Sequence, residues 1–117
     1  MYDLVIRGGS VVTPAGVLST DVAVFGEKIA ALGAPLEGRE VIDAAGKLVF
    51  PGVIDPHVHF ALPVGGSVSS DDFYSGSVAA ACGGVTSVID FTVGASDRSI
   101  PDDLRRRLED AKPSIID

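Results

Sequence analysis

The strongest constraint on this chain is a short apolar stretch that ends in two histidines. Residues 50–59 are FPGVIDPHVH. The β-branched Val53 and Ile54, bounded by proline and glycine, predict a buried β-strand. Because side chains alternate across a strand, His57 and His59 are expected to project on the same side at its C-terminal end. Two neighbouring imidazoles suit a zinc-type cation, whereas a bare His-x-His is also compatible with a merely polar strand end.

From residue 52 onward, strand and helix signals alternate, which favours an α/β fold with a parallel sheet. The first helix is expected to begin at the N-cap Ser70 and to bury Phe73, Val78, Ala80 and Ala81. The pattern as a whole predicts a loop over 60–69, a helix over 71–82, a strand over 85–91, a second helix from 99 and the start of a third strand over 114–117.

Residues 3–50 carry a different pattern. Short β-branched runs are separated by glycine- and proline-containing turns, and the first run stops at Gly8 and Gly9. Turn signals at intervals of about eight to twelve residues predict an antiparallel sheet or half of a β-sandwich. We therefore expect an all-β segment over 1–51 and an α/β segment over 52–117.

The composition narrows the class of protein. Of the 117 residues, 46% are hydrophobic and the formal net charge is −7, which argues against a nucleic-acid or anionic-membrane partner. The single cysteine, Cys82, excludes an internal disulfide and fits a reducing compartment. No leader peptide or membrane-length apolar run is recognisable. These features predict a cytoplasmic protein.

Several motifs carry a resemblance to a known family. Residues 51–60 resemble the first barrel strand of the amidohydrolase superfamily, and residues 62–66, 70–73 and 83–91 resemble the dihydropyrimidinases and hydantoinases. The resemblance is densest over 46–92. It implies a small β-sandwich beside a (β/α)₈ TIM barrel, which takes about 250 residues. The chain would then be truncated: an N-terminal part of the sandwich plus the first two β/α units, inactive as a fragment.

The resemblance also implies a metal site. His57 and His59 would be ligands of a centre that holds two zinc ions in the complete protein. The family's remaining ligands are a carboxylated lysine, two more histidines and an aspartate from later strands. Lys28, Lys47 and Lys112 are the lysines of this chain, and none lies at the end of a predicted barrel strand. The bridging ligand is therefore expected outside these residues.

Other residues are candidates for supporting roles. By the resemblance, Leu62 and Val64 would line the substrate pocket, although Val64 stands where a phenylalanine is common. Packing within the loop is the alternative for both. Asp55 and Asp90 are interpreted as carboxylates that orient an imidazole or shape the local backbone.

Two further features are interpreted as structural. Residues 105–107 are three consecutive arginines on a solvated helix face, because i,i+4 spacing pairs Asp102 with Arg106, Asp103 with Arg107 and Arg106 with Asp110. Cys82 has no histidine within sequence reach, so a nucleophilic role is not expected.

The loop after the histidines separates related activities. Ala61 stands where dihydroorotases carry an arginine, and Ala61-Leu62-Pro63 stands where allantoinases tend to show Asn-Glu-Pro. The resemblance therefore implies hydrolysis of a neutral cyclic amide, a dihydropyrimidine or a 5-substituted hydantoin, by a homo-oligomer such as a tetramer. The alternatives are another cyclic amidohydrolase such as allantoinase, a non-catalytic scaffold relative, or a truncated product without function.

Overall fold

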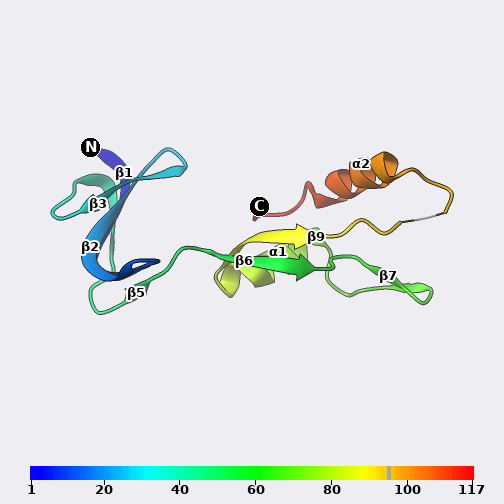
Figure 1. Ribbon diagram of the computed structural model, residues 1–117, viewed down its shortest axis with the longest axis horizontal. Helices are drawn as coiled ribbons and strands as arrows, with labels where there is room; N and C mark the ends of the chain where they lie inside the picture. The colour runs from blue at the N-terminus through cyan, green and yellow to red at the C-terminus, as the bar shows by residue number, and fades with distance from the viewer. Residues whose placement is uncertain (95) are drawn as a thin grey trace. The chain divides into compact units, whose positions relative to one another are not determined.

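The computed structural model describes residues 1–94 and 96–117. The chain divides into two compact units, Met1–Pro51 and Gly52–Asp117. We call them unit 1 and unit 2, and each is described by itself (Figure 1). No helix in the described ranges is long and apolar enough to cross a membrane.

Unit 1 is one mixed β-sheet. Its strands are β1 (Tyr2–Thr13), β2 (Gly16–Phe25), β3 (Lys28–Gly33), β4 (Gly38–Asp43) and β5 (Leu48–Val49). The order is β3-β2-β1-β4, and β5 pairs with β1 beyond the end of β4. Two antiparallel hairpins join β1, β2 and β3, whereas β4 and β5 run parallel to β1.

The expectation of an antiparallel sheet is therefore wrong for β4 and β5. After β3 the chain crosses to the other edge of β1 and returns in the same direction as β1. The predicted break at Gly8 and Gly9 is also wrong, because β1 continues through a register shift between Ile6 and Gly9. Gly8 has a φ of +70°, and a Cβ on Gly9 would lie 2.5 Å from Val49 Cγ2, so both glycines fit a bulge rather than a strand end.

The centre of unit 1 is apolar with one buried carboxylate. Asp21 accepts hydrogen bonds from the backbone amides of Gly8 (2.9 Å) and Leu36 (3.2 Å). It thereby ties the bulge of β1 to the loop that follows β3. The buried apolar residues around it are Val5, Val11, Val22, Ala23 and Ala44.

Unit 2 contains a β-α-β unit. Strands β6 (Val53–Val58) and β9 (Val85–Asp90) pair in parallel, with helix α1 (Phe73–Cys82) between them in sequence. Figure 1 shows the two strands side by side, followed by helix α2 (Ile100–Ala111). The segment predicted as a loop over 60–69 contains a small hairpin of β7 (Pro63–Val64) and β8 (Ser67–Val68).

The C-terminal residues lie along β9. No strand is assigned over 114–117, yet Val88 N donates to the Asp117 carbonyl (2.6 Å) and Asp117 N donates to the Thr86 carbonyl (3.2 Å). The predicted third strand is thus represented by one residue that pairs with the edge of β9.

Helix α1 begins later than predicted. Its N-cap is Asp72 rather than Ser70, because Asp72 Oδ1 accepts from Ser75 N (2.8 Å) while Ser75 Oγ accepts from Asp72 N (3.1 Å). This reciprocal capping box satisfies two amides at the helix start. Ser70, two residues upstream, is exposed and precedes the helix.

The buried face of α1 also differs from the prediction. Phe73 is buried as expected, but Ala81 is exposed, and Gly76 and Ser77 are buried instead. A Cβ at Gly76 would lie 2.3 Å from the Phe60 ring, and Ser77 Oγ accepts a hydrogen bond from Ile115 N (3.0 Å). Specific contacts, rather than an apolar stripe, therefore select the inward face of this helix.

Strand β6 is exposed in this structure. The predicted buried residues Val53 and Ile54 are 54% and 62% exposed, so that expectation is wrong for the described chain. The reason is that β6 has one paired neighbour, β9, and α1 packs mainly against β9.

Candidate metal centre

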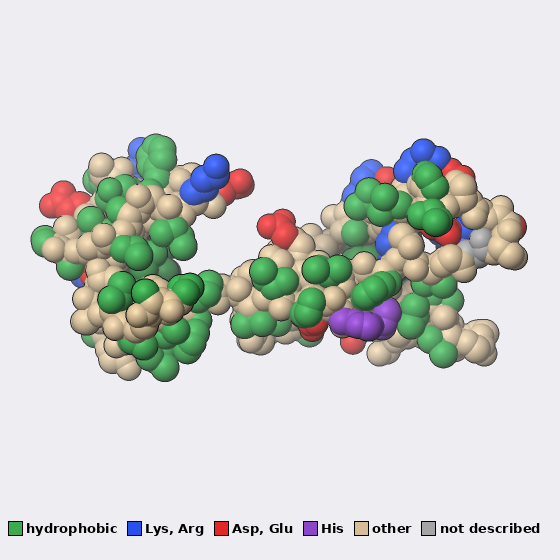
Figure 2. Space-filling model, viewed as in Figure 1, with side chains coloured by type: hydrophobic (Ala, Val, Ile, Leu, Met, Phe, Trp, Pro, Cys, Tyr) green, Lys and Arg blue, Asp and Glu red, His purple; other side chains and the backbone are tan. Residues whose placement is uncertain are grey.

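The structure brings the two histidines together. His57 lies in β6 and His59 follows its last residue, and both side chains are exposed. Their Nε2 atoms are 3.0 Å apart, with ring centroids separated by 4.9 Å and the ring planes 82° apart. Figure 2 shows the imidazoles as one purple cluster on the surface of unit 2, with hydrophobic side chains beside it.

The donor atoms of this pair fit a zinc-type cation. With Zn–N bonds of about 2.0–2.1 Å and tetrahedral angles, two nitrogen ligands lie about 3.3 Å apart. The observed 3.0 Å differs from this by a few tenths of an ångström. Within residues 1–94 and 96–117, however, no group of three or more His, Cys, Asp or Glu side chains could hold a metal ion. A cation held by His57 and His59 would therefore need further ligands beyond these two side chains.

Phe91 packs against both imidazoles and was not anticipated from the sequence. Its ring centroid lies 4.6 Å from that of His57 and 5.3 Å from that of His59. The register of the parallel pair explains this position, because Val58 lies opposite Asp90 and the strands therefore end together. The signal for Phe91 was its place as the last residue of the strand predicted over 85–91.

Asp55 contacts the backbone of the histidine segment. Its Oδ1 accepts a hydrogen bond from the amide of His57 at 3.1 Å. The carboxylate thus holds the chain across the Pro56 position. Its predicted action on an imidazole ring remains a prediction.

Asp90 occupies the equivalent end of β9 and is bound by two different groups. Its Oδ1 accepts from the Phe91 amide (2.7 Å), and its Oδ2 forms an ion pair with Arg107 Nη2 (2.5 Å). The Asp90 and Arg107 side chains are only 10% and 13% exposed. Asp90 is therefore held at the end of β9 by a residue from α2.

This contact corrects the interpretation of the arginine run. Arg107 is not on a solvated face, and the predicted i,i+4 pairs do not form among the described ion pairs. Asp102 pairs with Arg105 one turn along the helix, and Asp103 pairs with Arg98 at 2.8 Å. Arg107 lies on the side of α2 that faces β9 and pairs there with Asp90, whereas Arg105 is exposed to solvent.

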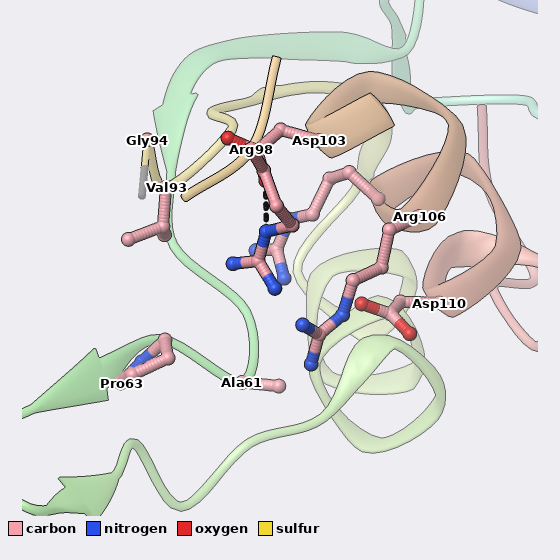
Figure 3. A pocket seen from close by; sticks show the side chains of 9 residues that line it. Ala61, Pro63, Val93, Gly94, Arg98, Asp103, Arg106 and Asp110 are labelled. Carbon is pink, nitrogen blue, oxygen red and sulfur yellow. Dashed lines mark hydrogen bonds and ion pairs between the residues drawn. The ribbon is translucent and has the colours of Figure 1, made fainter. Parts of the chain in front are cut away.

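The predicted pocket residues lie in the β7 hairpin. The Leu62 amide donates to Ser69 Oγ (2.8 Å), and Val64 is exposed in β7. A cavity of about 260 Å³ opens nearby, but neither side chain is among those that line it. Figure 3 shows Arg98 and Arg106 directed into this cavity, and its other lining residues include Ala61, Pro63 and Arg107. A role for Leu62 and Val64 in substrate binding remains a prediction.

Ala61 marks the sharp departure of the chain from β6. Its φ of +44° lies in the left-handed region, which is uncommon for a residue with a β-carbon. Its amide donates to the Asp71 carbonyl at 2.7 Å, which links this turn to the start of α1. The backbone that follows the histidine pair is therefore fixed at Ala61.

Known proteins are similar to this chain in sequence. The chain is 50% identical over 88 residues to a D-hydantoinase of Geobacillus stearothermophilus, covering 74% of this chain and 19% of that protein. It is 43% identical over 104 residues to the dihydropyrimidinase of Rattus norvegicus, covering 83% of the chain and 20% of the relative. No family model matches.

A solved structure matches nearly the whole chain. The D-hydantoinase from Bacillus sp. AR9 superposes with a TM-score of 0.94 at 43% identity, covering 98% of this chain and 26% of that one. The chain is thus similar, over most of its length, to a segment of the hydantoinases and dihydropyrimidinases. The chain belongs to the dihydropyrimidinase and D-hydantoinase family.

Two further findings concern how much of each relative the chain covers and which other proteins it resembles. The chain spans about a fifth of the length of the curated relatives it matches. An allantoinase of Desulfitobacterium hafniense and a dihydroorotase of Lactobacillus johnsonii are also 44% and 45% identical to it, over 81% and 83% of the chain and 21% of each relative. The relatives therefore include proteins named for different cyclic substrates.

Proposed function

We propose that the protein carrying this chain is a binuclear zinc hydrolase that opens cyclic amides, either dihydropyrimidines or 5-substituted hydantoins. In this proposal unit 2 begins a (β/α)₈ TIM barrel, and residues 1–51 belong to a small β-sandwich domain. The observation that carries the proposal is the 3.0 Å approach of the His57 and His59 Nε2 atoms at the end of β6. Because these residues supply two ligands, the described chain alone is expected to be inactive.

The residues of this chain would have distinct roles. His57 and His59 would hold the cation, which when bound supplies an activated water and polarises the ring carbonyl. Phe91 restricts the orientation of both imidazoles through ring contacts. Asp55 fixes the backbone that carries His57. The arrangement holds the ligands in place before metal binds, which lowers the cost of assembling the site.

A neutral ring is favoured over an acidic one. The segment directly after the histidines, Ala61-Leu62-Pro63, carries no charged side chain. A substrate carboxylate would therefore find no cation from this segment, which disfavours a dihydroorotate-type substrate. Allantoin remains the second candidate, since an allantoinase is among the relatives.

The cellular setting is also a proposal. The net charge of −7 and the single cysteine support a cytoplasmic protein without nucleic-acid or membrane partners. The family resemblance supports a homo-tetramer.

The test combines metal analysis with ring-opening assays of the complete protein. We expect stoichiometric zinc, together with hydrolysis of dihydrouracil and 5-substituted hydantoins that exceeds hydrolysis of allantoin and dihydroorotate. His57→Ala and His59→Ala should each lose metal and activity, whereas the exposed Asp97→Ala should change neither. Full activity in both histidine variants would contradict the metal centre. A wild-type protein that binds no metal would favour the scaffold alternative.

A further inference from the structure

One arginine joins the ends of both strands that build the histidine site. Arg107 Nη2 donates to the Phe60 carbonyl at 2.5 Å and forms an ion pair with Asp90 Oδ2, also at 2.5 Å. Arg107 comes from α2, 47 residues beyond Phe60. Its side chain is 13% exposed, so these contacts are shielded from solvent. Shielding strengthens a charge-assisted hydrogen bond relative to one at the surface.

The two acceptors are adjacent to the residues that would hold or orient the metal. Phe60 follows His59, so its carbonyl fixes the backbone on one side of the pair. Asp90 precedes Phe91, whose ring contacts both imidazoles, and Asp90 Oδ1 also accepts from the Phe91 amide. The Arg107 guanidinium therefore restrains the backbone next to His59 through the Phe60 carbonyl. It also restrains both imidazoles indirectly, through Asp90 and the Phe91 ring.

Packing holds the guanidinium in this position. Its carbon atom lies 4.6 Å from the centroid of the buried Phe73 ring, a cation–π arrangement. The Phe73 ring in turn contacts the Phe60 ring, with centroids 5.4 Å apart and planes at 70°. Arg107 is thus confined by α1, α2 and the two strand ends, and it has little freedom to leave the site.

We propose that Arg107 is a positioning residue that sets the separation of the His57 and His59 nitrogens for metal binding. This inference rests on the proposed function, because it assumes that the histidine pair is a metal site. Arg107 does not touch the imidazoles. It acts through the Phe60 carbonyl and through Asp90 and Phe91. Groups hydrogen-bonded directly to metal ligands change metal affinity by about 10- to 100-fold when they are replaced, and Arg107, which acts through intervening residues, is expected at the low end of that range.

The test measures metal binding directly. The complete protein, stripped of metal, is titrated with Co²⁺ and followed by visible absorption. Its Zn²⁺ affinity is obtained by competition with a chelator. Arg107→Met keeps the length of the side chain over Phe73 but removes both polar contacts, and it should weaken affinity by about tenfold or more. Arg107→Lys keeps the charge and should restore part of the loss. Arg105→Met, which changes a 72% exposed arginine of the same helix, should leave affinity unchanged.

A second readout separates positioning from general stability. Nuclear Overhauser contacts between the Phe91 ring and the two imidazoles are measured in the metal-free protein, with thermal unfolding as the folding control. These contacts should weaken in Arg107→Met and persist in Arg105→Met. Unchanged contacts and unchanged affinity in Arg107→Met would overturn the proposal. If Arg107→Met fails to fold, Arg107→Lys and Asp90→Asn provide the same comparison.

The outcomes also distinguish this inference from the proposed function. If His57→Ala loses Co²⁺ while Arg107→Met retains it, the metal site stands and the role of Arg107 is wrong. If the wild-type protein binds neither Co²⁺ nor Zn²⁺, the proposed function is wrong. The inference for metal binding falls with it, whatever the ring contacts show.

Discussion

The two units bury different kinds of groups. In unit 1 the centre of the sheet consists of buried apolar residues, among them the fully buried Val5 and Ala23. In the described part of unit 2, Phe73 is the one hydrophobic side chain classed as buried, and the other buried side chains there are Ser77 and Asp103. Contacts such as Asp90–Arg107 and Ser77–Ile115 hold unit 2 together instead.

The difference separates two ways of fixing a structure. An apolar core stabilises a fold without specifying the direction of any one group, because the hydrophobic effect is non-directional. Hydrogen bonds and ion pairs fix directions, which a metal site requires of its ligands. The unit that carries the histidine pair is the one that relies on directional contacts.

The largest effect on stability is expected at Asp21, the buried carboxylate in the otherwise apolar centre of unit 1. Asp21→Ala leaves the amides of Gly8 and Leu36 without their buried acceptor. We expect the free energy of unfolding of unit 1 to fall by about 3 kcal/mol, because two part-buried hydrogen bonds to a charged carboxylate are lost and each contributes about 1.5 kcal/mol. Amide hydrogen exchange in β1 and β2 measures this. The exposed Glu27→Ala should have little effect, and an equal effect of both variants would contradict the role of Asp21.

The apolar core of unit 1 gives the next largest effect. Val5→Ala removes two methyl groups from a fully buried position and should cost about 2 kcal/mol, through lost burial and the cavity that remains. Val17→Ala, at an exposed position of β2, is the matched control. Chemical denaturation checks both. A similar change in the two variants would indicate that the sheet centre does not carry the stability of unit 1.

A smaller effect is expected from close packing in unit 2. Gly76→Ala would normally stabilise a helix, but its Cβ would lie 2.3 Å from the Phe60 ring. Overpacking should outweigh the helical gain and leave unit 2 less stable by about 1 kcal/mol. In a Phe60→Leu background the same change should cost less. Thermal unfolding of the four proteins measures this coupling, and strict additivity would show that the two positions do not interact.

The smallest effect concerns pH. The Ser75 backbone amide, followed by the Ser75 side chain, holds the pKa of Asp72 below its ordinary value of 3.8. Because the folded-state pKa is the lower one, the stabilisation is complete above about 3.8 and is lost as the pH falls below that value through the folded-state pKa. Asp72→Asn keeps an acceptor but cannot titrate. The melting temperatures of wild type and Asp72→Asn should therefore converge as the pH falls below about 3.8, and a difference that stays the same across this range would contradict the role of Asp72.

Local features of the fold were predictable from particular residues. The alternation of side chains placed His57 and His59 on one side, and the structure brings their Nε2 atoms together. Glycines and prolines marked most turns, although Gly8 and Gly9 proved to lie in a bulge. The N-cap of α1 shifted from Ser70 to Asp72, because a capping box depends on the partner three residues later.

Non-local features were not predictable in the same way. Alternation is the same in parallel and antiparallel strands, so it could not show that β4 runs parallel to β1. Helical spacing predicted an ion pair between Arg107 and Asp103, four residues away, but in the structure Arg107 pairs with Asp90 of strand β9. The exposure of Val53 and Ile54 depends on which elements cover β6, and local pattern does not contain that information.

The sequence by itself determined the strand, the spacing of its two histidines and the family to which the chain belongs. Those features depend on residue order and on the two-residue period of a β-strand. Only the tertiary structure decided that Phe91 packs on both imidazoles and that Arg107 binds the Phe60 carbonyl and Asp90. These groups lie far apart in the chain. They meet because β6 and β9 end together and the side chain of Arg107 reaches both ends from α2.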